Sequence, residues 1–392
     1  MSISQLDSRY LAKTYSRFSM EFSHGKGATV YDTKGKEYID LGSGIAVNIF
    51  GLNDESWKNA VTAQLNNYQH CSNLYYSEPV VKLAELLCQK TGMERVFFSN
   101  SGAEANECAI KAARKWAAEQ KGPEYQNIVT LNKSFHGRTL ATLAATGQEV
   151  YHRDYAPLPG GFLHVDAGNS AQLEQLVQEQ PCAAVMIECV QGEGGVMPIG
   201  QRYADEIRRI CEKYALLLIC DEVQLGNGRS GKLFGYMRYG LQPDLVTTAK
   251  GLGGGLPIGA TLFGPRTADT FRPGDHGSTF GGNSVCCAGA LDILRRIDDA
   301  LLQGVLEREQ YIRQELEQAP GILAVNGMGL MLGLSIPTPA RTFAERLLEK
   351  GVLVTTAKDK IRLLPSLNIP MEQLKIAVQI IKDCAAAQEE TQ

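Results

Sequence analysis

Short apolar runs alternate with amphipathic stretches through the middle of this chain of 392 residues, and this alternation limits its fold more than any other feature. The runs have the length of buried strands, and they occupy residues 95–98, 127–131, 183–187, 216–220, 245–248 and 258–263. Between them, residues 103–120 and 201–214 have the apolar spacing of amphipathic helices. Strands that alternate with helices predict an α/β domain with a mostly parallel sheet, which binds ligands at the carboxyl ends of its strands.

The two ends of the chain have a different pattern, and we expect them to form one smaller α+β domain together. Residues 28–41 alternate in the manner of a β-hairpin. Beyond about residue 285 come two long helical stretches, a strand-like run at 328–336, a helix, strands at 352–356 and 361–364, and a last helix from Met371. The sequence thus predicts a large domain over residues 51–290 and a small domain from residues 1–50 and 291–392.

Composition favours small-molecule chemistry. Lysine and arginine number 39 and aspartate and glutamate 43, so a net charge of −4 leaves no basic surface for nucleic acid. The longest wholly apolar run, residues 215–220, is far shorter than the roughly 20 residues that span a bilayer, and residues 1–18 do not form a secretory signal. The ten cysteines lie mostly in apolar stretches without a Cys-x-x-Cys pair, which predicts reduced core residues in a cytoplasmic protein and no metal site.

Lys250 and Asp221 each follow or end a predicted strand. Asp221 directly follows the run 216–220, and Lys250 comes two residues after the run 245–248. Such a pair suits a pyridoxal phosphate enzyme, in which a lysine forms the Schiff base with the cofactor and a carboxylate keeps the pyridine nitrogen protonated. An aspartate that caps a helix and a lysine on a solvated loop would look the same, so the pair alone leaves both interpretations open.

A phosphate site is predicted where residues 97–107 pass from a strand through small residues into a helix. The backbone N–H groups of Gly102 and Ala103 would face an anion there, with the helix dipole behind them. Ser101 and Glu104 also have the spacing of a capping box, which many helices use without a ligand. The glycines of residues 251–255 lack the pattern of a P-loop, and we expect them to let the backbone pack close to Lys250.

Two arginines and one aromatic residue complete the set. Phe135 follows a predicted strand, where its ring could lie on a flat cofactor, and Arg138 could bind a carboxylate through two hydrogen bonds. Arg362 is a charge inside an apolar strand, so it needs a carboxylate from Glu193 or from a substrate. An ordinary salt bridge would also explain Arg362, and His136 is expected to support a turn.

Together these motifs resemble a known family. The stretches that look like those of class III pyridoxal phosphate aminotransferases are residues 100–107, 135–138, 188–195, 221–224, 250–251 and 278–283. Residues 44–48 and 72–76 are most similar to the acetylornithine aminotransferases of arginine biosynthesis. The resemblance covers the chain from about Phe18 to the last helix. It implies the type I fold of pyridoxal phosphate-dependent transferases, with pyridoxal 5'-phosphate as cofactor.

The resemblance also implies a role for each matching residue. The implied cofactor-binding residues are Gly102, Ala103, Phe135, Asp221, Glu222, Val223, Gln224, Lys250 and Thr279. Among them Lys250 and Asp221 are catalytic: Lys250 carries the cofactor and Asp221 binds the ring nitrogen. Val223 and Phe135 would cover the two ring faces, and Gln224 would lie beside the ring hydroxyl. Thr279 would come from a neighbouring subunit, which implies a homodimer with shared sites.

The implied substrate-binding residues are Arg138, Ser278, Arg362 and Glu193. Arg138 would bind the α-carboxylate of N-acetylornithine, and Ser278 would contact the same substrate. Arg362 would bind the α-carboxylate of glutamate and pair with Glu193 otherwise. The resemblance therefore implies transfer of an amino group from acetylornithine to 2-oxoglutarate.

The chain departs from the family pattern in loops near the expected site. Residues 51–55 replace the usual Gly-His-x-His-Pro, Leu225 stands in place of the usual threonine, and Ser366 replaces a common proline. These changes leave the amine donor open among acetylornithine, ornithine, 4-aminobutyrate and succinyl-diaminopimelate. A non-catalytic binding protein of the same fold is disfavoured because Lys250, Asp221 and both arginines are present.

Overall fold

A seven-stranded sheet forms the centre of the larger part of the structure, a computed structural model that describes residues 2–389. Its strands, in order across the sheet, are β4 (Arg95–Ser99), β12 (Gly259–Phe263), β11 (Leu245–Thr248), β10 (Leu217–Asp221), β7 (Cys182–Ile187), β5 (Asn127–Leu131) and β6 (Phe162–Val165). Strands β11, β10, β7, β5 and β6 pair in parallel, and β12 runs antiparallel to both of its neighbours. The predicted α/β fold with a mostly parallel sheet is confirmed.

All six predicted strands of this sheet are present, and their ends differ from the prediction by at most one residue. The seventh strand, β6, was missed. It lies at the edge of the sheet and contains a polar residue, His164, whose Nδ1 lies 2.7 Å from Thr130 Oγ1 of β5. A short edge strand needs no continuous apolar run, so its sequence gives a weak signal.

Helices cover both faces of the sheet, which explains why its central strands are mostly apolar. Alternate strand residues contact different layers: Met186 and Ile219 pack with helix α5 (Gly102–Gln120), while Leu218 packs with helix α8 (Gln201–Lys213). The other helices of this part are α3 (Glu55–Asn67), α4 (Glu78–Thr91), α6 (Leu140–Ala145), α7 (Ser170–Glu179) and α9 (Ser284–Arg296). The sheet is therefore buried between two helical layers.

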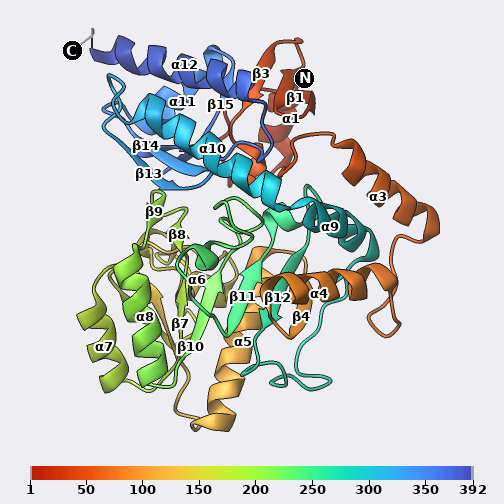
Figure 1. Cartoon of the computed structure of the whole chain (residues 1–392), viewed down its shortest axis with the longest axis vertical. Coiled ribbons are helices and arrows are strands. Elements are labelled where there is room, and N and C mark those ends of the chain that lie inside the picture. Colours follow the sequence, from red (N-terminus) through yellow and green to blue (C-terminus); the bar gives the residue numbers. More distant parts are fainter. Residues whose placement is uncertain (1, 390–392) are drawn as a thin grey trace.

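The two chain ends lie together on top of this part (Figure 1). The first of two small sheets has the order β1 (Phe22–Lys26), β2 (Thr29–Asp32), β3 (Glu37–Asp40), β15 (Val352–Leu353), and the second β13 (Ala324–Met328), β14 (Met331–Ser335), β17 (Lys360–Leu363), β16 (Thr355–Ala357). Helices α1 (Ile3–Tyr10), α10 (Asp299–Leu316), α11 (Ala340–Glu349) and α12 (Met371–Glu389) accompany them. Strand β15 pairs in parallel with β3, so both ends share one sheet. The domain boundaries themselves stay a prediction, and residue 290 falls inside α9.

Two predicted strands at the C-terminal end differ from the structure. The run 328–336 begins at the turn between β13 and β14 and otherwise contains only β14, so β13 was missed; Gly327 in β13 has φ of 117°, and Gly329 in the turn has φ of 58°. A Cβ on Gly329 would lie 2.1 Å from the carbonyl oxygen of Arg229, so this tight turn against the larger part requires glycine. The stretch 352–356 divides because β15 joins the N-terminal sheet and β16 joins β17.

All ten cysteines are free, and seven of them are buried. Within the described residues, no helix is long and apolar enough to cross a membrane.

Candidate active site

A cavity of about 650 Å³ opens at the carboxyl ends of the parallel strands. Three of these strands deliver polar groups to its wall: β10 ends with Asp221, β7 is followed by Glu188, and β11 is followed by Lys250 after one residue. Parallel strands end at the same edge of a sheet, so residues that are far apart in the sequence meet there. The cavity lies where the alternating pattern predicted a ligand.

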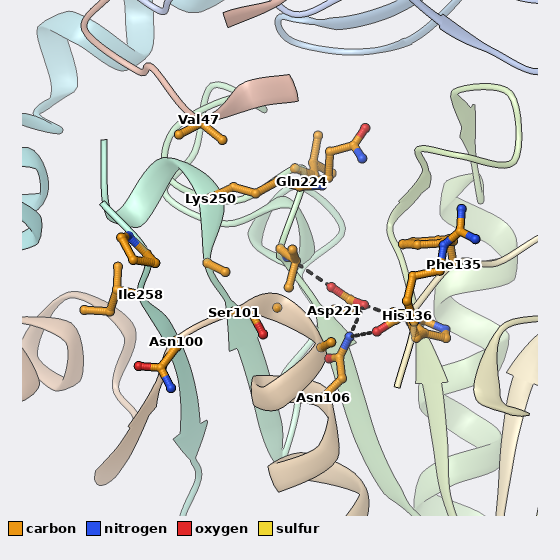
Figure 2. A pocket seen from close by; sticks show the side chains of 18 of the residues that line it. Val47, Asn100, Ser101, Asn106, Phe135, His136, Asp221, Gln224, Lys250 and Ile258 are labelled. Carbon is orange, nitrogen blue, oxygen red and sulfur yellow. Dashed lines mark hydrogen bonds and ion pairs between the residues drawn. The ribbon is translucent and has the colours of Figure 1, made fainter. Parts of the chain in front are cut away.

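Lys250 projects into this cavity from a strained position (Figure 2). It begins the 3-10 turn η3 (Lys250–Leu252) with φ of 43°, a backbone conformation that residues other than glycine seldom adopt. Its surroundings withdraw the amine from bulk water, and this desolvation lowers the pKa of Lys250 to about 8, although Glu193 opposes the shift. A larger share of the amine is then neutral and nucleophilic near neutral pH.

The glycine loop after Lys250 packs as closely as its composition predicted. A Cβ on Gly253 would lie 2.0 Å from the carbonyl oxygen of Leu256, and one on Gly251 would lie 2.5 Å from Ile49. These glycines bring the backbone of η3 against its neighbours and fix where Lys250 emerges.

Asp221 is held by three hydrogen bonds at the edge of the cavity. Its Oδ2 accepts a hydrogen bond from Asn106 Nδ2 at 2.8 Å and lies 2.8 Å from His136 Nδ1, and its Oδ1 accepts one from the backbone N–H of Val223 at 3.0 Å (Figure 2). Burial alone would lower the pKa of His136, but the hydrogen bond and charge of Asp221 raise it above its ordinary value. The site therefore presents a fixed carboxylate to the cavity, backed by an imidazole.

The first turn of α5 faces the same cavity with unused backbone donors. The N–H groups of Gly102 and Ala103 have no partner among residues 2–389. A Cβ on Gly102 would lie 2.6 Å from Val223 Cγ1, so only glycine lets the helix begin this close to Val223. Free N–H groups and the helix dipole favour an anion at this point.

The predicted capping box is only half present. Ser101 caps α5, because its Oγ accepts a hydrogen bond from the N–H of Glu104 at 3.2 Å. The carboxylate of Glu104 accepts from the N–H of Asn100 at 2.5 Å and not from that of Ser101. The turn before α5 is thus closed one residue earlier than the motif predicts.

Phe135 and Arg138 also line the cavity. The ring of Phe135 meets that of Tyr151 edge-on, with centroids 5.8 Å apart. The guanidinium of Arg138 lies over the ring of Tyr151, 4.3 Å from its centroid. Among the described residues Arg138 has no hydrogen bond or ion pair, so its planar fork is available to a carboxylate that enters the cavity.

Arg362 lies behind the cavity wall and is paired. It is 2% exposed, and its Nη1 lies 2.5 Å from Glu193 Oε1 and 3.0 Å from Gln224 Oε1. Burial opposes ionisation of Glu193, but the charge and hydrogen bond of Arg362 outweigh it and lower the pKa of Glu193. Gln224 lines the cavity, whereas Arg362 and Glu193 do not, so this ion pair stands one side chain away from the open space.

Besides Arg362 and Glu193, three more residues of the expected site lie outside the cavity of the single chain. Ser278 and Thr279 line a separate hollow of about 440 Å³, although Ser278 Oγ accepts a hydrogen bond from Asn100 Nδ2 at 3.2 Å, and Asn100 reaches the main cavity. Glu222 turns away from the cavity, and its carboxylate accepts hydrogen bonds from the N–H groups of Gly235 and Tyr236. Burial raises the pKa of Glu222 to about 8.

The cavity also contains residues to which the sequence assigned no role. Asn106 was inside a recognised motif, and its position four residues after Gly102 places it on the same face of α5, which would have been a usable signal. Glu188 directly follows β7, so its position at a strand end was a second signal. Tyr15 lines the cavity from a segment without regular structure, and nothing in its local sequence indicates this.

This fold and site define a class of protein. Residues 10–385 match the family model of class-III aminotransferases, and the chain belongs to that family. It is accordingly a pyridoxal phosphate-dependent transaminase that acts on small molecules. Among curated relatives, the acetylornithine aminotransferase of Haemophilus ducreyi is 44% identical over 381 residues, which cover 97% of each chain.

Solved structures show the same likeness. The N-acetylornithine aminotransferase of Stenotrophomonas maltophilia is 35% identical, with a TM-score of 0.85 over 99% of this chain and 100% of that one. The ornithine aminotransferase of Toxoplasma gondii is 29% identical, with a TM-score of 0.94 over 99% of this chain and 95% of that one.

The groups around the cavity suit pyridoxal phosphate. Two unpartnered backbone N–H groups at a helix start can bind the phosphate, and Asp221 can pair with a protonated ring nitrogen. Lys250 offers an amine of lowered pKa, and Phe135 offers an aromatic surface for a flat ring. The donor set thus matches the cofactor that the family uses.

Proposed function

We propose that the protein is an acetylornithine aminotransferase, which transfers the distal amino group of N2-acetyl-L-ornithine to 2-oxoglutarate in arginine biosynthesis. The products are N-acetyl-L-glutamate 5-semialdehyde and L-glutamate. The observation that carries this proposal is the presence of two arginines in different states: Arg138 is free at the cavity, while Arg362 is neutralised by Glu193 behind Gln224. The printed names of the relatives point the same way.

The two arginines answer a requirement of the reaction. Acetylornithine presents an amine far from its α-carboxylate, whereas glutamate presents an amine next to it. One cavity must therefore hold the two α-carboxylates at different distances from the reacting carbon. Arg138 would hold the α-carboxylate of acetylornithine, and Arg362 would hold that of glutamate once Glu193 releases it.

The remaining residues hold the cofactor and move one proton. Bound pyridoxal phosphate supplies an electron-accepting ring. Gly102 and Ala103 would bind its phosphate, and Asp221 its ring nitrogen. Val223 and Phe135 would cover the ring faces.

Lys250 and Gln224 would complete the machinery. With its pKa lowered to about 8, Lys250 Nζ can be neutral near neutral pH. It would carry the cofactor, and it would then move a proton from the amine-bearing carbon of the substrate to the cofactor carbon that is bonded to the substrate nitrogen. Gln224 would lie beside the ring hydroxyl. Its Oε1 accepts a hydrogen bond from Arg362 and its Nε2 donates one to Glu193, so it would link that side of the ring to the Arg362–Glu193 pair.

A panel of amine donors tests the substrate. With 2-oxoglutarate as acceptor and glutamate formation as readout, we expect kcat/KM for acetylornithine to exceed that for ornithine by at least about tenfold. The α-ammonium of ornithine is charged where acetylornithine has a neutral amide, and a buried charge must find a partner. Ornithine is the second candidate, since the Toxoplasma ornithine aminotransferase has the same fold with a TM-score of 0.94. A higher kcat/KM for ornithine, 4-aminobutyrate or succinyl-diaminopimelate would overturn the proposed donor.

The proposal includes a homodimer with shared sites in the cytoplasm. Thr279 lies outside the cavity of its own chain, beside apolar side chains that are unusually exposed for a single chain: Leu74 (87%), Tyr75 (73%), Tyr76 (102%) and Phe280 (61%). A second copy that covers this surface would bury these side chains and bring its Thr279 to the phosphate. Free cysteines throughout are consistent with a reducing compartment.

Mixing two inactive variants tests the shared site. Subunits with Lys250→Ala and subunits with Thr279→Ala should each be impaired alone at limiting cofactor. After unfolding and joint refolding, random pairing should restore about one quarter of the wild-type sites, because half of the dimers then hold one intact site. The control is the same mixture without exchange of subunits. A monomer with full activity would contradict the shared site.

A further inference from the structure

A chain of three buried polar side chains leads from the sheet to the edge of the cavity. The hydroxyl of Thr247, on β11, donates to Asn106 Oδ1 at 2.6 Å. Asn106 Nδ2 in turn donates to Asp221 Oδ2 at 2.8 Å and to the carbonyl oxygen of His136 at 2.7 Å. Thr247 is fully buried and Asn106 is 1% exposed, so water cannot replace either partner easily.

The hydrogen bonds fix which way the amide of Asn106 points. Its oxygen accepts from Thr247, and its two N–H groups serve Asp221 and the carbonyl of His136. A flipped amide would turn its oxygen toward the carboxylate of Asp221 and its nitrogen toward Thr247, so two acceptors would face each other at 2.8 Å. The Thr247 hydroxyl therefore keeps the donor of Asn106 on Asp221.

The fold fixes the positions of the three hydrogen-bonded side chains. Thr247 and Asp221 are direct partners in the parallel pairing of β11 with β10. Asn106 comes four residues after Gly102, so it lies on the same face of α5 as Gly102, one turn beyond the helix start that carries the free N–H groups. This hydrogen-bonded series thus links the start of α5, where the phosphate would bind, to the carboxylate of Asp221.

We propose that Thr247 and Asn106 are positioning residues that set the orientation of Asp221 toward the cofactor ring. This inference rests on the proposed role of Asp221. Oδ2 is occupied by Asn106 and His136, and among residues 2–389 only Val223 donates to Oδ1, so Oδ1 can accept a second hydrogen bond from a donor in the cavity. Without Asn106 the carboxylate keeps one fewer fixed donor and can rotate away from the ring nitrogen.

The neighbouring strand supplies a matched control. Thr261, on β12, is the cross-strand partner of Thr247 and is also fully buried. Its hydroxyl donates to the carbonyl oxygen of Ala105, at 2.7 Å, in the residue just before Asn106. Thr247→Val and Thr261→Val therefore each remove one buried hydroxyl from the same strand pair and helix, but only Thr247→Val breaks the connection to Asp221.

The experiment titrates pyridoxal phosphate into each cofactor-free variant. We expect Thr247→Val to raise its Kd about three- to tenfold, the effect of one lost hydrogen bond, and Thr261→Val to leave it within about twofold of wild type. Thr247→Val should also move the pH midpoint of the bound cofactor's absorption by about half a pH unit or more, because ring protonation weakens. Thr247→Ser keeps the hydroxyl and should restore both values.

Asp221→Asn separates the two ways in which the proposal can fail. If Asp221→Asn weakens cofactor binding and Thr247→Val does not, the positioning role of Thr247 is wrong. Equal effects of Thr247→Val and Thr261→Val on Kd would also overturn it, since that result reports a general packing loss. If Asp221→Asn itself binds the cofactor as tightly as wild type, with an unchanged midpoint, then the proposed role of Asp221 falls and this inference falls with it.

Discussion

Lys250→Ala is expected to lower turnover by at least about a thousandfold, because it removes both the nucleophile and the proton-transferring group from the site. The side chain of Lys250 forms no hydrogen bond or ion pair within residues 2–389, so its loss should cost little stability. The variant should therefore still fold and should still bind pyridoxal phosphate through the other groups of the cavity. Steady-state kinetics and a thermal melt measure these two results separately.

Borohydride reduction followed by peptide mapping identifies the lysine directly. The wild-type protein should yield a cofactor-labelled peptide that contains Lys250, and Lys250→Ala should yield none. Lys360→Met serves as the control, because Lys360 is also a largely buried lysine. It lies on β17, and its Nζ donates a hydrogen bond to Asn326 Oδ1 at 2.8 Å. That variant should be labelled as wild type is, and a label on any lysine other than Lys250 would show that the assignment is wrong.

The order of the strands in sequence was predictable, but their division between sheets was not. Runs such as 127–131 and 245–248 gave strand boundaries directly, because strands buried on both faces need continuous apolar residues. The stretch 352–356 also has the pattern of one strand, yet Val352–Leu353 pairs with β3 and Thr355–Ala357 with β17. Which partner a strand takes depends on long-range packing that a local pattern does not contain.

The same limit applies to the site. Strand-end positions made Asp221 and Lys250 recognisable, since parallel strands deliver their last residues to one edge. Glu222 follows Asp221 directly and points the other way, into hydrogen bonds with the backbone of Gly235 and Tyr236. Thr247 lies in the interior of an apolar strand, and only the register with Asp221 reveals what its hydroxyl contacts.

The second large effect concerns Arg362, whose replacement by alanine should impair only one of the two half-reactions. Arg362 would bind the α-carboxylate of glutamate, and a buried charge left without its partner costs on the order of 2 to 5 kcal/mol, or roughly thirty- to several-thousand-fold in kcat/KM. Arg362→Ala should slow the glutamate half-reaction by that factor and spare the acetylornithine half-reaction. Arg138→Ala should slow both, because Arg138 would also bind the side-chain carboxylate of glutamate.

Removing Arg362 leaves Glu193 without its partner at 2.5 Å, so stability needs its own control. The double variant Arg362→Ala with Glu193→Gln removes that unpaired charge, and it should show the same difference between the half-reactions. If only the single variant loses the glutamate half-reaction, the cause is the stranded carboxylate and not the lost binding group.

Glu193→Ala completes the argument from the other side of the pair. Without Glu193, the partners of Arg362 among residues 2–389 are the neutral Gln224 Oε1 and Thr355 Oγ1, so it is open to any α-carboxylate in the cavity. Unacetylated ornithine should then react through its α-amine, as glutamate does. In the wild-type protein, the pairing of Arg362 with Glu193 suppresses this reaction. Single-turnover measurements of each half-reaction, with product analysis for ornithine, test both variants. Equal losses in the two halves for Arg362→Ala would contradict the use of two separate carboxylate sites.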